Sequence, residues 1–312
     1  MDLLSAVLQE LRLHSATYRH LELHPPWRLR FDGGLRGVHV VLTGGGTLTP
    51  DGQPPRHLGP GDLVVLPRAD SHELASPCAA GTPALSSLEL ARRTDGNRIV
   101  VDGAGPPGEV TTLLCGAFFF DDTDHPAIAG FPVCIHVPGQ QGRAPAWLAG
   151  LTAVLATETQ HGGPGSEIVM ARLSDALITR ALRHHLETAD ETGWLRGLRD
   201  PHIAKALAAI HTDLAKAWTL PLMARTAGLS RSAFAARFTH IVGQTPMQYL
   251  YRRRMRKAAT MLRAEDATVA SIATRVGYGS EAAFSAAFTR HTGMPPGVYR
   301  RFAGVAAPDG RV

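Results

Sequence analysis

The sequence predicts an α+β fold, in which a β-barrel or sandwich is followed by an all-α domain with two helix-turn-helix units. Short β-branched and aromatic runs, separated by glycine, proline and aspartate, fill residues 27–138 and are typical of an all-β domain. From about Ala146 the apolar residues are spaced at three and four, which indicates helices. A pattern that begins at Ser230 is repeated at Ser280. The chain of 312 residues is long enough for two such domains.

The first residues, MDLLSAVLQELRLHS, predict an amphipathic helix. They include acidic residues and lack the basic-then-apolar layout of a signal peptide. No uninterrupted apolar stretch is long enough to span a bilayer, so no membrane partner is expected. The cysteines Cys78, Cys115 and Cys134 form no C-x-x-C pair and favour a reducing compartment. We therefore expect a cytoplasmic protein.

Four runs carry the strand prediction: GVHVVLTGGGTL, GPGDLVVLP, TTLLCGAFFF and FPVCIHVPG. The glycine, proline and aspartate residues between them are strong turn formers. The run Gly44–Gly46 lacks the spacing and the following helix of a phosphate-binding loop. We therefore expect a hairpin at these glycines.

Two helices are predicted over 147–160 and 167–187, joined by a flexible turn at 161–165. The second keeps four apolar residues near one face: Ile168, Leu173, Leu177 and Leu182. Packing inside the domain explains this stripe. A two-fold helical contact in a homodimer explains it as well, and the sequence leaves both open.

Residues 200–301 are expected to be helical throughout. Capping residues mark the helix starts: Asp200, Thr219, Ser230, Thr268 and Ser280. The expected helices span 202–215, 220–227, 230–241, 246–263, 268–275, 280–291 and 296–301.

The repeated pattern is S-x-x-x-F-x-x-x-F-T-x-x-x-G-x-x-P-x-x-Y. Each copy follows a short apolar helix and a turn with glycine, which is the helix-turn-helix plan. The two phenylalanines of each copy lie at i and i+4 and are expected to pack onto the first helix. The opposite face is small and almost uncharged, unlike an ordinary solvated face, and fits close approach to a polyanion.

The net charge of +5 conceals a division between the two halves of the chain. Residues 201–312 hold 16 basic and 5 acidic residues, a net of +11, whereas residues 1–200 carry a net of −6. Such an asymmetry is typical of a nucleic-acid-binding module joined to another domain. Most of the basic residues are arginine, whose planar fork suits phosphate and guanine.

The double helix-turn-helix, the segment PMQYLYRRRMRKAATMLR and the closing G-x-x-P-x-x-Y-R resemble the DNA-binding domain of AraC/XylS-family transcription regulators. The resemblance covers about residues 200–302. It implies that residues 246–263 form a stiff connector, which places two recognition helices in successive major-groove segments of double-stranded DNA. By position, the base-facing candidates are Arg231, Ser232, Ala235, Ala236, Glu281, Ala282, Ser285 and Ala286.

Four of those eight residues are alanine, so few base hydrogen bonds are expected. Arg231 can donate to guanine and Glu281 can accept from cytosine. Methyl contacts and DNA deformability supply the remaining discrimination. Five further arginines are better candidates for phosphate contacts than for base contacts: Arg237, Arg252, Arg253, Arg256 and Arg290.

The strand runs, together with PWRLRF and LGPGDLVVLPRADSHEL, resemble the cupin-type effector domain of the same family, in the subgroup that includes the reactive-chlorine-responsive regulators. Pro67 to His72 has the spacing of the second metal motif of cupins, with Ala69 in place of the usual glycine. The first motif, H-x-H with a glutamate, is absent, and only His39 stands near its place. Enzymatic cupin chemistry is therefore not expected.

Three kinds of sensor site stay open. His39, His72 and Cys115 could converge on zinc or a similar divalent metal, although each alone is typical of a buried, hydrogen-bonded side chain. Cys115, Cys78 and Cys134 are candidates for thiol oxidation. A small-molecule pocket without either feature is the third possibility.

The sequence thus predicts a DNA-binding transcription regulator and not an enzyme. The expected domains are a cupin-like effector domain over 1–140, a helical linker with a possible dimer contact over 141–198, and a DNA-binding domain over 199–312. The partners expected are double-stranded DNA, an unidentified effector and a second copy of the chain. The alternatives are an effector-independent DNA-binding protein whose β-domain only dimerises, and a cupin-type metal enzyme.

Overall fold

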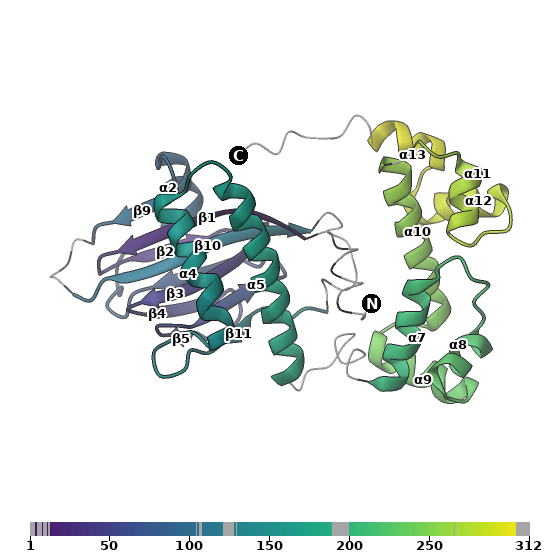
Figure 1. The fold of residues 1–312 in the computed structure, drawn as a ribbon, viewed down its shortest axis with the longest axis horizontal. Helices are drawn as coiled ribbons and strands as arrows, with labels where there is room; N and C mark the ends of the chain where they lie inside the picture. Colours follow the sequence, from purple (N-terminus) through teal and green to yellow (C-terminus); the bar gives the residue numbers. More distant parts are fainter. Residues whose placement is uncertain are drawn as a thin grey trace. The chain divides into compact units, whose positions relative to one another are not determined.

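The computed structural model describes residues 13–103, 105, 108–120, 128, 130–188, 200–264 and 266–303, together with Leu4, Leu8 and Leu11. The chain divides into two compact units (Figure 1). One holds the described residues from Leu8 to Thr188, and the other holds those from Asp200 to Ala303 together with Leu4. The predicted helix over residues 1–15 lies mostly outside the described residues. Its last three residues belong instead to a strand, because the chain from Leu13 pairs with a neighbouring strand.

The N-terminal unit contains a six-stranded sheet in the order β11-β6-β3-β10-β1-β9. Its strands are β1 (Leu13–Leu23), β3 (Arg36–Thr43), β6 (Leu63–Leu66), β9 (Arg98–Val101), β10 (Thr111–Phe120) and β11 (Ile135–Val137). The central strand β10 pairs antiparallel with β1 on one side and with β3 on the other. The four predicted strand runs are therefore confirmed, since each supplies one of these strands.

A second sheet has five strands in the order β5-β4-β7-β2-β8. Its strands are β2 (Arg28–Phe31), β4 (Gly46–Pro50), β5 (Arg56–Leu58), β7 (His72–Ala75) and β8 (Leu85–Ser86). A buried cluster formed by side chains of both sheets lies between them, with Trp27, Leu29 and Leu48 from one side and Leu23 and Leu113 from the other. The hydrogen bonding divides the described strands between two sheets, packed face to face as in a sandwich.

The hairpin predicted at Gly44–Gly46 is wrong. Strand β3 lies in the first sheet and β4 in the second, so the glycines carry the chain from one sheet to the other. A β-carbon on Gly44 would lie 2.8 Å from Thr111 Oγ1, and one on Gly45 would lie 2.7 Å from the carbonyl oxygen of Leu58. Glycine is required here because the corner passes against two other segments of backbone.

Helices α4 (Ala146–His161) and α5 (Ser166–Thr188) have almost the predicted limits. They contact β1 and cover one face of the first sheet (Figure 1). The Tyr18 hydroxyl and Ser174 Oγ form a buried hydrogen bond of 2.9 Å that ties α5 to β1. Of the predicted apolar stripe, Leu177 is buried, whereas 69% of Ile168 is exposed. Packing inside the domain therefore accounts for part of the stripe only. A short helix that the sequence analysis missed, α2 (Ser87–Arg93), follows β8.

The C-terminal unit is helical, as predicted. Its described helices are α7 (Pro201–Thr212), α8 (Leu220–Ala227), α9 (Arg231–Val242), α10 (Pro246–Ala264), α11 (Val269–Arg275), α12 (Glu281–Thr292) and α13 (Pro296–Ala303). The largest error is at the end of α7, which was expected to reach residue 215. Asp213 caps this helix and the chain turns there, because the Trp218 indole donates to the Asp213 carbonyl oxygen.

In the part of the chain that the structure describes, no helix is both long and apolar enough to cross a membrane.

Candidate functional site

Helices α9 and α12 are the second helices of the two helix-turn-helix units. The Ser230 side chain caps α9 by accepting from the Ala233 amide, and Ser280 caps α12 in the same way. Phe234 and Phe238 are completely buried with ring centroids 5.4 Å apart. Their counterparts Phe284 and Phe288 are equally buried, with centroids 5.5 Å apart. The prediction that the phenylalanines build the core is confirmed, and it leaves the opposite face of each helix outside.

The residues predicted to face DNA bases lie on those outer faces. Six of them are exposed: Arg231, Ser232, Ala236, Glu281, Ala282 and Ala286. The other two, Ala235 and Ser285, are half-buried and occupy matching positions in the two helices. Each helix therefore presents a small surface with one charged residue near its start, positive on α9 and negative on α12.

The five arginines predicted to contact phosphate do not form a uniform group. Arg252 and Arg290 are exposed, as such a role requires. Arg237 is exposed, but its Nε donates to the Asp200 carboxylate at 2.6 Å, so a phosphate would have to compete with that ion pair. Arg253 is half-buried, and burial lowers its pKa to about 9. Arg256 is half-buried as well.

His39, His72 and Cys115 meet inside the N-terminal unit, as the sequence analysis expected. His39 on β3 lies opposite Cys115 on β10, and its Nδ1 is 3.1 Å from Cys115 Sγ. Its Nε2 is 2.8 Å from His72 Nε2. Phe31 stacks on His72 at 4.6 Å and meets His39 edge-on at 4.7 Å. A β-carbon on Gly37 would lie 3.1 Å from His39 Nε2, so this glycine makes room for the pair.

This cluster is a hydrogen-bonded chain, and it does not fit a metal ion. His39 turns opposite ring nitrogens toward Cys115 and His72, so the three donor atoms do not point at one centre. Among the described residues, no group of three or more His, Cys, Asp or Glu side chains is placed to hold a metal. Burial holds the pKa of His39 well below its usual range and lowers that of His72 to about 4. Both imidazoles are therefore neutral near pH 7, and one donates to the other.

The three cysteines lie in different surroundings. Burial raises the pKa of the Cys115 thiol, and it raises that of Cys134 to about 11. Both therefore hold little of the reactive thiolate at neutral pH. Cys78 is exposed, with its sulfur 3.6 Å from Ser76 Oγ. Of the three predicted redox residues, only Cys78 has the access that a thiol sensor needs.

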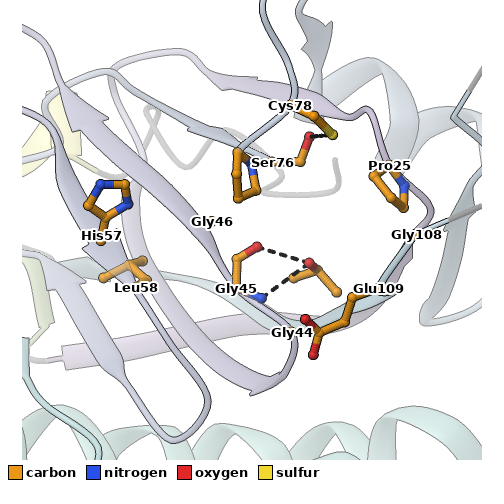
Figure 2. Close-up of a pocket in the computed structure, with 12 residues that line it drawn as sticks. Pro25, Gly44, Gly45, Gly46, His57, Leu58, Ser76, Cys78, Gly108 and Glu109 are labelled. Atoms are coloured by element: carbon orange, nitrogen blue, oxygen red, sulfur yellow. Dashed lines mark hydrogen bonds between the residues drawn. The ribbon is translucent and has the colours of Figure 1, made fainter. Parts of the chain in front are cut away.

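Cys78 lines a pocket of about 370 Å³ at the corner between the two sheets (Figure 2). The lining residues are Pro25, Gly44, Gly45, Gly46, His57, Leu58, Ser76, Pro77, Cys78, Gly108, Glu109 and Thr111. Thr111 Oγ1 accepts from the Gly45 amide and donates to the Gly45 carbonyl oxygen. These two hydrogen bonds fix the glycine backbone that lines the pocket. The volume is in the range of small-molecule sites. A small-molecule pocket was one of the three sensor sites left open by the sequence, but its place at this corner was not predicted. Its one signal was the glycine run, which was taken for a hairpin.

Comparison with known proteins identifies the family. Residues 2–187 match the cupin family model, and residues 223–301 match a helix-turn-helix domain model. An AraC-like transcription regulator of Streptomyces lividans is 38% identical over 306 residues, covering 96% of this chain and 98% of its own length. The chain belongs to the AraC family of transcription regulators. It is a DNA-binding regulator and not an enzyme.

Two further relatives of this AraC-family protein extend the comparison. RclR of Escherichia coli, an RCS-specific transcriptional activator, is 26% identical over 313 residues, covering 99% of this chain and all of its own. Among solved structures, the DNA-binding domain of AdpA in complex with a target DNA is 31% identical and covers 36% of this chain and 99% of its own, with a TM-score of 0.34.

Proposed function

We propose that the N-terminal unit of this AraC-family regulator senses a small molecule and thereby changes how α9 and α12 are presented to DNA. The observation that supports it is the 370 Å³ pocket at the corner between the sheets. The corner joins the two sheets that hold the domain core, so an occupant there touches both. A ligand can shift a regulator only if it binds one of its two states more tightly.

The test fills the pocket by a substitution at Cys78, which is exposed and lies on its wall. Compounds that raise the melting temperature of the wild-type protein are first selected by screening. We expect Cys78→Trp to abolish both the stabilisation and the effect of the compound on DNA affinity. Ala80→Trp is the matched control, because Ala80 is exposed, two residues away and outside the lining. A compound that acts equally on both variants binds elsewhere.

The same experiment separates this proposal from the effector-independent alternative. In that case no stabilising compound changes DNA affinity in the wild-type protein, and the β-rich unit has a structural role only. A response to oxidant that disappears in Cys78→Ser, but persists in Cys134→Ser, would instead assign a thiol sensor to the exposed cysteine.

For the DNA interface, we propose the outer faces of α9 and α12 with Arg231 and Glu281 as the base-reading residues, and Arg252 and Arg290 as phosphate contacts. Their exposure and the net charge of +11 over residues 201–312 support this assignment. Phosphate contacts release counterions, so affinity should fall steeply as salt is raised. The expected location of such a regulator is the cytoplasm.

A homodimer through α4 and α5 completes the proposal. Val154 on α4 is 44% exposed, and Ile168 and Val169 at the start of α5 are 69% and 39% exposed. Exposed apolar residues on two neighbouring helices are candidates for a contact surface. Sedimentation should give a dimer for the wild-type chain and a monomer for Ile168→Glu. A dimer that survives this substitution would place the contact elsewhere.

A further inference from the structure

A junction of three segments joins the two helix-turn-helix units, and Arg254 is at its centre. The first segment is the loop of residues 213–219 between α7 and α8, which belongs to the first unit. The second is the connector helix α10, which carries Arg254. The third is the turn at Gly277 and Tyr278, which leads into α12.

The loop is braced by its own residues. The Asp213 side chain accepts from the Lys216 amide at 3.1 Å. The indole of the buried Trp218 donates to the Asp213 carbonyl oxygen at 2.8 Å, and Lys216 Nζ lies 4.8 Å from the centre of that ring. These contacts fix the backbone carbonyl groups between Asp213 and Trp218.

Arg254 binds two of these carbonyl groups. Its Nε donates to the Leu214 oxygen at 3.2 Å, and its Nη2 donates to the Lys216 oxygen at 2.8 Å. The fork shape of the guanidinium suits two acceptors two residues apart. Arg254 therefore ties the connector helix to the loop of the first unit.

The same guanidinium lies against the turn of the second unit. Its Cζ is 5.9 Å from the centre of the Tyr278 ring, and that ring meets Phe284 of α12 edge-on at 5.7 Å. Gly277 has a φ of +87°, and a β-carbon there would overlap the guanidinium and lie 2.7 Å from the Ala215 carbonyl oxygen. Only glycine fits, because both the backbone angle and the close approach exclude a side chain.

We propose that Arg254 is a positioning residue that sets the distance between α9 and α12, and hence the spacing of the two DNA segments that the protein recognises. At the end of the connector that precedes Arg254, the Tyr249 hydroxyl also contacts His211 of α7, so Arg254 is the link that ties the loop of the first unit to the turn of the second. This inference rests on the assignment of α9 and α12 as paired recognition helices. It adds that the spacing preference of the protein resides in one side chain that touches no DNA.

The test measures a ratio of affinities. An operator is isolated by selecting random duplexes on the full-length protein, and one base pair is then inserted between its two recognised segments. We expect the wild-type protein to lose affinity roughly tenfold on insertion, because one helix then misses its groove. For Arg254→Met the loss should shrink to about threefold or less, because a looser junction accommodates both duplexes. A ratio cancels the fraction of protein that is folded.

Arg263→Met is the matched control. Arg263 lies on the same helix and donates to the Tyr299 hydroxyl at 2.8 Å, a contact within the second unit. It should keep the wild-type spacing preference. If Arg254→Met discriminates between the two duplexes as the wild type does, the junction does not set the spacing. If the wild type itself is indifferent to the insertion, both this inference and the pairing of α9 with α12 are wrong.

Discussion

The two helix-turn-helix units are copies in their scaffold and differ in the residues outside it. Both second helices begin at a capping serine and end at a glycine with a φ of 77° or 78°. Both close with a tyrosine whose ring meets the second phenylalanine edge-on: Tyr249 on Phe238 at 5.7 Å, and Tyr299 on Phe288 at 5.3 Å. The repeated residues thus serve folding.

Three of the differences change charge, turn length or hydrogen bonding. Arg231 in the first unit stands where the second has Glu281. The stretch from the turn glycine to the capping serine is one residue longer in the second unit, because Gly279 precedes Ser280 there. The tyrosine hydroxyl contacts His211 in the first unit and Arg263 in the second. A shared scaffold therefore leaves room for different base contacts, and the junction at Arg254 is built on the longer turn.

The largest expected effect tests the shared scaffold. Phe238→Ala and Phe288→Ala should each lower the free energy of unfolding by about 3–5 kcal/mol, because both rings are fully buried and leave a cavity. Denaturant unfolding followed by circular dichroism measures this. A loss below about 1 kcal/mol in one copy only would show that the two cores are not equivalent.

Acid should destabilise the first helix-turn-helix unit more than the second. Burial lowers the pKa of His211 to about 4, whereas its unfolded value is near 6.5. The stability that neutral His211 contributes is therefore complete above pH 6.5 and falls as the pH drops from 6.5 toward 4, by up to about 1.4 kcal/mol per pH unit. In the second unit the corresponding tyrosine hydroxyl, that of Tyr299, contacts Arg263 instead of a histidine.

Hydrogen exchange at pH 7 and pH 5 makes the comparison. Amides of α7 and α9 should lose protection on acidification more than those of α12 and α13. His211→Gln should remove the difference. Equal loss in both units, or a difference that survives this substitution, would contradict the role given to the histidine.

Removal of a base contact should weaken DNA binding by an intermediate amount. Arg231→Ala should cost about 1–3 kcal/mol and relax the preference at one base pair. Arg252→Ala, at a proposed phosphate contact, should weaken binding to operator and scrambled DNA alike and reduce the salt dependence by about one ion. Titration against both duplexes distinguishes the two, and an equal loss for Arg231→Ala on both would exclude a base contact.

Replacing the capping serines should have the smallest effects on stability, and these effects should be equal in the two units. Ser230 and Ser280 accept from the third helical amide at 3.3 and 3.2 Å. Replacing either by alanine should cost about 1 kcal/mol of stability, and replacement by aspartate should retain it. Thermal unfolding of the four variants checks this, and a clear inequality between the two alanine variants would mean that the caps differ in the intact protein.

The helical half was predicted almost to the residue because capping residues, prolines and the repeat are local signals. The exception was the end of α7, where the Trp218 indole is hydrogen-bonded to the Asp213 carbonyl oxygen. The spacing of apolar residues does not reveal such a contact. The N-terminal half was predicted as strands but not in its pairing: Gly44–Gly46 was taken for a hairpin although it joins two sheets. Pairing depends on contacts between distant segments, such as Gly45 with Thr111. For the same reason the sequence could propose His39, His72 and Cys115 as neighbours, but it could not show that they form a chain instead of a metal site.

The most direct test of the two-helix account is the DNA selected from random duplexes by the wild-type protein, by Arg231→Ala and by Glu281→Ala. The wild type should select two segments about 10–10.5 base pairs apart, centre to centre. Arg231→Ala should relax one segment and Glu281→Ala the other. If both substitutions alter the same segment, or neither alters any, then α9 and α12 do not contact separate parts of one operator.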